Sequence, residues 1–86
     1  MNFISVSSFE KQLKKLPKKT KAQVVERLKI FMLDEFSPIL NNHKLHGEFK
    51  DYHSININGD IRLIYRKIGN HSYYLLAIGT HSELYS

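Results

Sequence analysis

The dipeptide Asn58-Gly59 separates two strand-like runs and constrains the fold of the C-terminal half more than any other feature. Asn-Gly favours the two-residue type I′ turn of a β-hairpin, because both central residues of that turn need a positive φ. Apolar and β-branched residues are frequent in the flanking runs, 52–57 and 60–67, and a third such run, 73–78, follows a loop at Gly69-Asn70. Three strands joined by two short turns predict an antiparallel meander.

The register of the first hairpin stays open at this point. A two-residue turn pairs Asn56 with Ile61 and places Ile55 on one face with Arg62. Neither face is then uniformly apolar, although a sheet covered by helices on one side normally alternates more cleanly. Either the turn differs by a residue or two, or polar groups line an exposed working face.

The N-terminal segment predicts a strand followed by a short helix. Residues 2–6 alternate in polarity, as a strand does. Ser7 or Ser8 can cap a helix that continues through Leu16, and Pro17 interrupts that helix because proline lacks the backbone N–H that a helix interior needs.

A longer helix is expected from about 18 to 35, and Ser37-Pro38 ends it. The apolar side chains of its predicted buried face follow helical spacing; they are Val24, Val25, Leu28, Phe31 and Met32. The stretch 38–50 is expected to be mostly loop, with Leu40 and Leu45 as apolar anchors.

Together these elements predict an α+β fold with an N-terminal strand, two helices and an antiparallel three-strand meander, and with the helices packed on one sheet face. Eighty-six residues suffice for one small core, so a single domain over 1–86 is expected. The predicted core includes Val24, Leu28, Phe31, Ile55, Leu63, Leu75 and Leu76.

Positive charge is concentrated near the N-terminus. The chain has a net charge of +5, and six of its lysines lie between positions 11 and 21: Lys11, Lys14, Lys15, Lys18, Lys19 and Lys21. Such a cluster suits a phosphate backbone or an acidic protein partner, and it also fits a solvated helix face.

The composition argues against several classes of protein. The chain has no cysteine, so disulfides and thiolate metal sites are excluded, which fits a reducing cytoplasm. No apolar run approaches the ~20 residues that cross a bilayer, and the N-terminus does not follow the pattern of a signal peptide. We therefore expect a cytoplasmic protein without a membrane partner.

All five histidines follow residue 42. His43 and His46 form an HxxH pair, but zinc needs further ligands and the spacing is unusual for helical metal pairs, so no metal is expected. His53 and His71 are interpreted as surface residues. His43 and His81 are retained as candidates for proton transfer near neutral pH. Imidazoles beside cationic side chains suit RNA cleavage, since RNA supplies its own 2′-hydroxyl nucleophile.

Three blocks of the C-terminal half resemble the RelE/ParE superfamily, and most closely its YafQ-like mRNA interferases. They are HKLHGEFKDY at 43–52, DIRLIYR at 60–66 and GTHSELY at 79–85. The resemblance implies a toxin of a type II toxin–antitoxin system. It implies a metal-independent, cofactor-free and ribosome-dependent endoribonuclease that cleaves mRNA, leaves a 2′,3′-cyclic phosphate and inhibits translation. A cognate antitoxin, the ribosome and mRNA would be its partners.

Carried over by position, the resemblance implies four active-site residues: His43, Asp60, His81 and Tyr85. His81 is the candidate acid, and either His43 or Asp60 is the candidate base. Two positions depart from the YafQ-like pattern, since Asn56 stands where that branch often has histidine and Ile61 where it often has tryptophan.

The resemblance also suggests which side chains contact RNA. The lysine cluster and Asn56 are candidates, and Arg62 and Arg66 are candidates for stabilising the phosphorane, although strand arginines are more often surface ion-pair residues. Two alternatives remain. One is a non-catalytic toxin of the same fold, such as a gyrase inhibitor, and the other is a nucleic-acid-binding module whose catalytic residues have decayed.

Overall fold

The structure is a computed structural model that describes residues 1–85. Ser86, the last residue of the chain, lies outside the described residues. The elements in chain order are β1 (Asn2–Ser5), α1 (Ser7–Lys14), α2 (Lys18–Leu33), the 3-10 turn η1 (Pro38–Leu40), β2 (His43–Lys44), the 3-10 turn η2 (Gly47–Phe49), β3 (His53–Asn56), β4 (Ile61–Ile68), β5 (Ser72–Thr80) and α3 (His81–Tyr85). This arrangement confirms the predicted α+β class.

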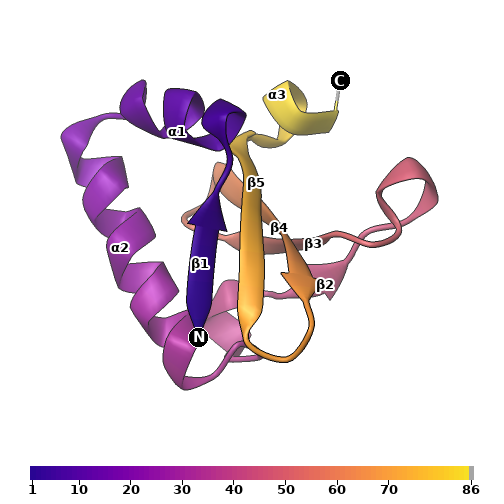
Figure 1. Cartoon of the computed structure of the whole chain (residues 1–86). Helices are drawn as coiled ribbons and strands as arrows, with labels where there is room; N and C mark the ends of the chain where they lie inside the picture. The colour runs from indigo at the N-terminus through magenta and orange to yellow at the C-terminus, as the bar shows by residue number, and fades with distance from the viewer. Residues whose placement is uncertain (86) are drawn as a thin grey trace.

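The predicted meander of β3, β4 and β5 is present, and two further strands extend it. Over residues 1–85 the sheet has five strands in the order β1-β5-β4-β3-β2 (Figure 1). β1 pairs in parallel with β5, with Phe3 opposite Tyr73. β2 lies in a stretch predicted to be loop, and it pairs with β3 through His43 opposite Ser54. This correction matters because β2 carries His43 into the sheet.

The register of the β3–β4 hairpin is shifted by one residue from that of a two-residue turn. Asn56 lies opposite Arg62 instead of Ile61. The side-chain oxygen of Asn58 accepts hydrogen bonds from the backbone N–H groups of Asp60 and Ile61, at 2.8 Å each. Because this side chain organises the loop, the adjacent glycine needs no positive φ and has none. The predicted type I′ turn is therefore wrong.

This one-residue difference separates apolar from polar side chains. Ile55 lies opposite Leu63, and both are fully buried on the face that packs against the helices. Ser54, Asn56 and Arg62 alternate with them along their strands and occupy the other face. Both explanations left open by the sequence are correct. The turn register differs by one residue from that of a two-residue turn, and polar residues line the sheet face opposite the helices.

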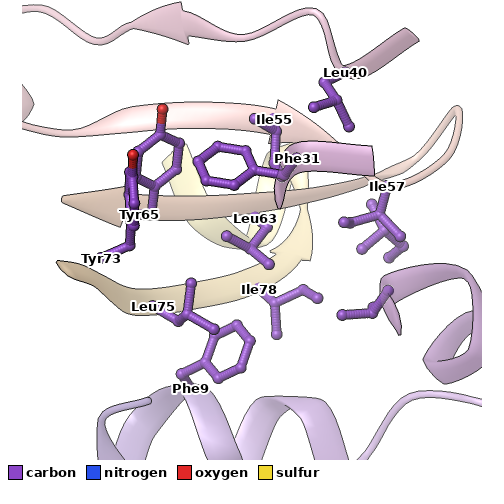
Figure 2. Close-up of a cluster of buried hydrophobic side chains, with 12 residues drawn as sticks. Phe9, Phe31, Leu40, Ile55, Ile57, Leu63, Tyr65, Tyr73, Leu75 and Ile78 are labelled. Atoms are coloured by element: carbon purple, nitrogen blue, oxygen red, sulfur yellow. The ribbon is translucent and has the colours of Figure 1, made fainter. Parts of the chain in front are cut away.

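α1 and α2 cover the same face of the sheet. Phe9 of α1 lies beside Leu75, and Phe31 of α2 inserts beside Tyr65 and Tyr73, with ring centroids 5.1 Å from each (Figure 2). Aromatic pairs at this separation add to the free energy gained by burial. With the helices on this face, the other face is left for the polar residues.

Most of the predicted core is confirmed. Five of the predicted residues are buried: Val24, Phe31, Ile55, Leu63 and Leu75. Leu28 is partly buried against them. Leu76 is only half-buried, because it lies at a β-bulge of the β4–β5 pair. Ile64 pairs with Ala77 and the next residue, Tyr65, pairs with Leu75, so Leu76 has no partner on β4.

Some helix details also differ from the prediction. Val25 and Met32 are more than half exposed, because α2 turns the neighbouring positions, Val24 and Phe31, toward the sheet. The N-cap of α1 is Val6, without a side-chain cap. The hydroxyl of Ser8 instead donates to the carbonyl of Leu76 at 3.3 Å. Within residues 1–85, no helix combines the length and the apolar character needed to cross a membrane.

Candidate active site

A pocket of about 360 Å³ lies on the face of the sheet opposite α1 and α2. Its walls come from β2 and the segment after it, from β3 and β4, and from α3. The lining residues are His43, Lys44, Leu45, His46, Ser54, Arg62, His81 and Tyr85. The fold thus brings together three of the four predicted catalytic residues and one predicted RNA-binding arginine, although almost forty residues separate His43 from His81.

The orientation of the His43 imidazole is set by the main chain. Its Nδ1 lies 2.9 Å from the carbonyl oxygen of Asn41. A carbonyl oxygen only accepts hydrogen bonds, so Nδ1 carries the hydrogen in this contact. In the neutral ring the lone pair is then on Nε2. His43 is exposed, so this nitrogen can serve as a proton acceptor for a bound molecule.

α3 carries the other two predicted catalytic side chains. This helix begins at His81, directly after β5 ends at Thr80. The rings of His81 and Tyr85 lie one helical turn apart, with centroids separated by 4.6 Å. Tyr85 also contacts Phe49 of η2 edge-on, with centroids 6.5 Å apart. An imidazole and an aromatic surface therefore form one wall of the pocket.

A reciprocal capping box holds α3 at the end of β5. The backbone N–H of Thr80 donates to Glu83 Oε1 at 2.8 Å, and the N–H of Glu83 donates to Thr80 Oγ1 at 3.2 Å. The hydrogen bond from the Thr80 N–H is the main cause that lowers the pKa of Glu83. Gly79 permits this close approach, because a Cβ there would lie 3.2 Å from Glu83 Oε1.

Replacing Glu83 by Ala should therefore loosen α3 without unfolding the domain. Loss of the cap frees the first turn of α3, so His81 and Tyr85 lose their fixed positions, and for the RNA cleavage that the family resemblance implies we expect the rate to fall roughly 10-fold. Single-turnover RNA cleavage and circular dichroism measure the two effects. Ser82→Ala, an exposed change in the same helix, is the control. Equal rates for the two variants would show that the cap does not position the site.

Arg62 lines the pocket with its guanidinium anchored to the hairpin loop. Nη1 donates to the carbonyl oxygens of Asn58 at 2.8 Å and Ile61 at 3.2 Å, and Nη2 donates to that of Gly59 at 3.2 Å. These bonds to neutral carbonyls leave the positive charge without a carboxylate partner among the described residues. Arg62 can therefore contribute its charge to an anion in the pocket.

The remaining predicted residues of the C-terminal half lie outside the pocket lining. Asp60 is exposed in the hairpin loop, at the sheet end where α3 begins, since Ile61 pairs with Thr80. Asn56 is half-buried beside Arg62. Arg66 is exposed four residues farther along β4.

Lys44, His46 and Ser54 line the pocket although the sequence did not single them out. His46 was set aside with the HxxH metal interpretation, but its position in the block 43–52 could have drawn attention to it. Within residues 1–85, no group of three or more His, Cys, Asp or Glu side chains could hold a metal ion. His53 is not a simple surface residue: it stacks on Tyr65 with centroids 5.2 Å apart, and its pKa is lowered, mainly by burial.

The lysine cluster surrounds the corner between α1 and α2. Lys11, Lys14, Lys15, Lys18 and Lys19 are exposed, and Lys21 is half-buried. Lys15 lines a second, smaller pocket of about 290 Å³ together with Gly79 and Glu83. The basic surface therefore reaches the base of α3.

A sequence model described as "Bacterial toxin of type II toxin-antitoxin system, YafQ" matches residues 1–86. The chain belongs to the YafQ family. This assignment confirms the resemblance of the three C-terminal blocks and extends it over the full length. No curated protein matches the chain in a sequence search.

Solved structures show the same fold for other toxins. YafQ from E. coli strain BL21(DE3) aligns with a TM-score of 0.83 at 18% identity, over 99% of this chain and 98% of that one. The YoeB/ParE toxin from Agrobacterium tumefaciens aligns with a TM-score of 0.80 at 15% identity, over 94% and 99%. A similar chain in the E. coli DinJ-YafQ toxin-antitoxin complex gives a TM-score of 0.78 at 20% identity, over 99% and 97%.

Proposed function

We propose that this YafQ-family toxin is an endoribonuclease that cleaves mRNA on the ribosome and thereby inhibits translation. The main support is the pocket that combines three imidazoles, those of His43, His46 and His81, with a guanidinium and a tyrosine ring. Cleavage by the 2′-hydroxyl needs a base, an acid and positive charge near the phosphorus, and this set supplies all three. The proposed reaction requires neither a metal ion nor a cofactor.

In the proposed reaction His43 Nε2 removes the proton from the 2′-hydroxyl. The 2′-oxygen then attacks the adjacent phosphorus, and the bond from phosphorus to the 5′-oxygen breaks. Arg62 stabilises the negative charge of the phosphorane, and His81 donates a proton to the leaving 5′-oxygen. The products are a 2′,3′-cyclic phosphate and a 5′-hydroxyl, and Tyr85 orients the substrate by stacking on a base.

His43 is favoured over Asp60 as the base. The Asn41 carbonyl already places the hydrogen of His43 on Nδ1, which leaves Nε2 free to accept a proton. Asp60 belongs to the hairpin loop and not to the pocket lining. Cleavage that survives Asp60→Asn but not His43→Gln would support this assignment, and the opposite result would make Asp60 the base.

The proposed partners are the translating ribosome, its mRNA and a cognate antitoxin, all in the cytoplasm. E. coli YafQ has been solved in a complex with DinJ, and that assembly supports an antitoxin partner for this chain. The basic N-terminal helices favour an antitoxin segment that carries acidic and apolar residues.

The decisive experiment is translation in vitro with purified components and primer-extension mapping of the mRNA. We expect a cut within a codon on the ribosome. The cut should persist in EDTA when enough magnesium is added back to keep the ribosomes intact. Inhibition of DNA gyrase with uncut mRNA would instead favour the non-catalytic toxin. If the protein does neither, the decayed binding module becomes the better description.

The lysine cluster should supply electrostatic affinity for ribosomal RNA. Four lysines are changed together to Glu: Lys14, Lys15, Lys18 and Lys19. The variant should bind ribosomes more weakly. The slope of log affinity against log salt concentration should become shallower by about one unit for each lysine that contacts a phosphate. Co-sedimentation at several salt concentrations measures the slope. Lys50→Glu, an exposed change in another part of the chain, is the control. Unchanged affinity of the quadruple variant would identify the lysines as a solvated surface.

A further inference from the structure

Asn42, the residue before His43, is held by two hydrogen bonds on the side of the sheet away from the pocket. Its Nδ2 donates to the hydroxyl of Tyr65 at 2.8 Å and to the backbone carbonyl of Glu35 at 2.9 Å. Both hydrogens of the amide nitrogen are thereby used. A backbone carbonyl can only accept, so the Glu35 contact also settles which way the amide faces.

The Tyr65 acceptor is held in place by the core. Tyr65 is 2% exposed, and its ring packs edge-on against Phe31 and Tyr73, with centroids 5.1 and 5.7 Å away. Burial raises the pKa of Tyr65 to about 12, so its hydroxyl stays neutral at physiological pH. Glu35 follows the end of α2. Asn42 therefore ties the chain before β2 to a central strand and to the segment that follows α2.

Asn41, the residue before Asn42, orients the imidazole of His43. Asn41 adopts the left-handed conformation, with φ 45° and ψ 49°, which asparagine tolerates better than most residues. Its N–H donates to the carbonyl of Pro38 at 3.1 Å, and its own carbonyl faces His43 Nδ1. The direction of that carbonyl depends on the backbone between η1 and Asn42.

We infer that Asn42 is a positioning residue that fixes the tautomer of His43. By anchoring the turn it keeps the Asn41 carbonyl against Nδ1, and so keeps the basic lone pair on Nε2 toward the pocket. Asn42 does not line the pocket, so it acts on catalysis only through His43. The catalytic part of this inference rests on the proposed function; the tautomer does not.

Two variants with conserved shape test this role. Asn42→Asp keeps the size of the side chain but removes both donors, and Tyr65→Phe keeps the packed ring but removes the acceptor. Tyr73→Phe is the matched control, since it also removes one hydroxyl from the same aromatic cluster. The Tyr73 hydroxyl lies 3.4 Å from the Glu35 carboxylate oxygen Oε2 and does not contact Asn42. Nitrogen-15 NMR of the labelled imidazoles reports the His43 tautomer directly.

We expect wild type and Tyr73→Phe to hold the Nδ1–H tautomer, and Asn42→Asp to show a mixture of tautomers. Tyr65→Phe should fall between them, because the Glu35 bond remains. On programmed ribosomes, Asn42→Asp should lower kcat about 10- to 100-fold with little change in KM, as expected for a misplaced base. The acidic limb of its pH–rate profile, which reports the general base, should differ from that of the control.

The tautomer measurement decides the inference and the wild-type cleavage assay decides the proposed function. If both variants retain the Nδ1–H tautomer, Asn42 does not position His43 and the inference is wrong, whatever the cleavage rates. If wild type does not cut ribosome-bound mRNA but Asn42→Asp still changes the tautomer, the positioning stands and the endoribonuclease assignment fails.

Discussion

His81→Gln is expected to lower the rate of mRNA cleavage by about 10²-fold or more, the usual scale for losing a general acid. Glutamine keeps a polar side chain of similar reach but cannot donate a proton to the leaving 5′-oxygen. His81 is exposed and lies outside the hydrophobic core, so folding should not change. Single-turnover cleavage on programmed ribosomes measures the rate, and growth arrest on induction gives an independent measure.

His71→Gln is the matched control, because it makes the same chemical change at an exposed histidine of the β4–β5 turn, at the opposite end of β5 from α3. It should cleave like wild type. A His81→Gln protein that still cuts ribosome-bound mRNA at the wild-type rate would show that another group protonates the leaving oxygen, and would leave His81 as a surface residue.

Phe31→Ala is expected to lower the free energy of unfolding by about 3–5 kcal/mol, through lost burial and the cavity that remains. Phe31 is 1% exposed, and its ring contacts Tyr65, Tyr73 and Phe3. A domain of this size has only about 5–15 kcal/mol of stability, so a large part of the population should unfold in mild urea. Urea denaturation followed by circular dichroism measures the difference.

Met32→Ala controls for the helix, since Met32 is the next residue of α2 and is 53% exposed. It should change stability by less than about 1 kcal/mol. Similar losses for the two variants would mean that Phe31 contributes through the helix alone and not through its packing between the aromatic rings of β4 and β5.

Local rules acting on short stretches determined much of this fold before any tertiary contact was known. Pro17 separates two helices because of its missing N–H, and the apolar runs after residue 52 form the meander because alternating side chains need one buried face. The three C-terminal blocks also identified the family. They selected His43, Asp60, His81 and Tyr85, and the structure places all of these except Asp60 in one pocket.

Tertiary structure decided the features that depend on residues far apart in the chain. β1 joins β5 in parallel across almost seventy residues, which no local pattern indicates. The His43–Lys44 strand is too short to recognise and exists because β3 offers it a free edge. In the hairpin, the Asn58 side chain displaced the expected type I′ turn by satisfying two backbone N–H groups.

That one-residue change in register is also what puts Ser54 and Arg62 on the pocket face and Ile55 and Leu63 in the core. The sequence alone identified which residue types were available for proton transfer and anion binding. Which of them meet in one pocket was set by strand pairing, because each side chain's face depends on the partner strand's register, and register minimises the free energy of the whole sheet rather than of one turn.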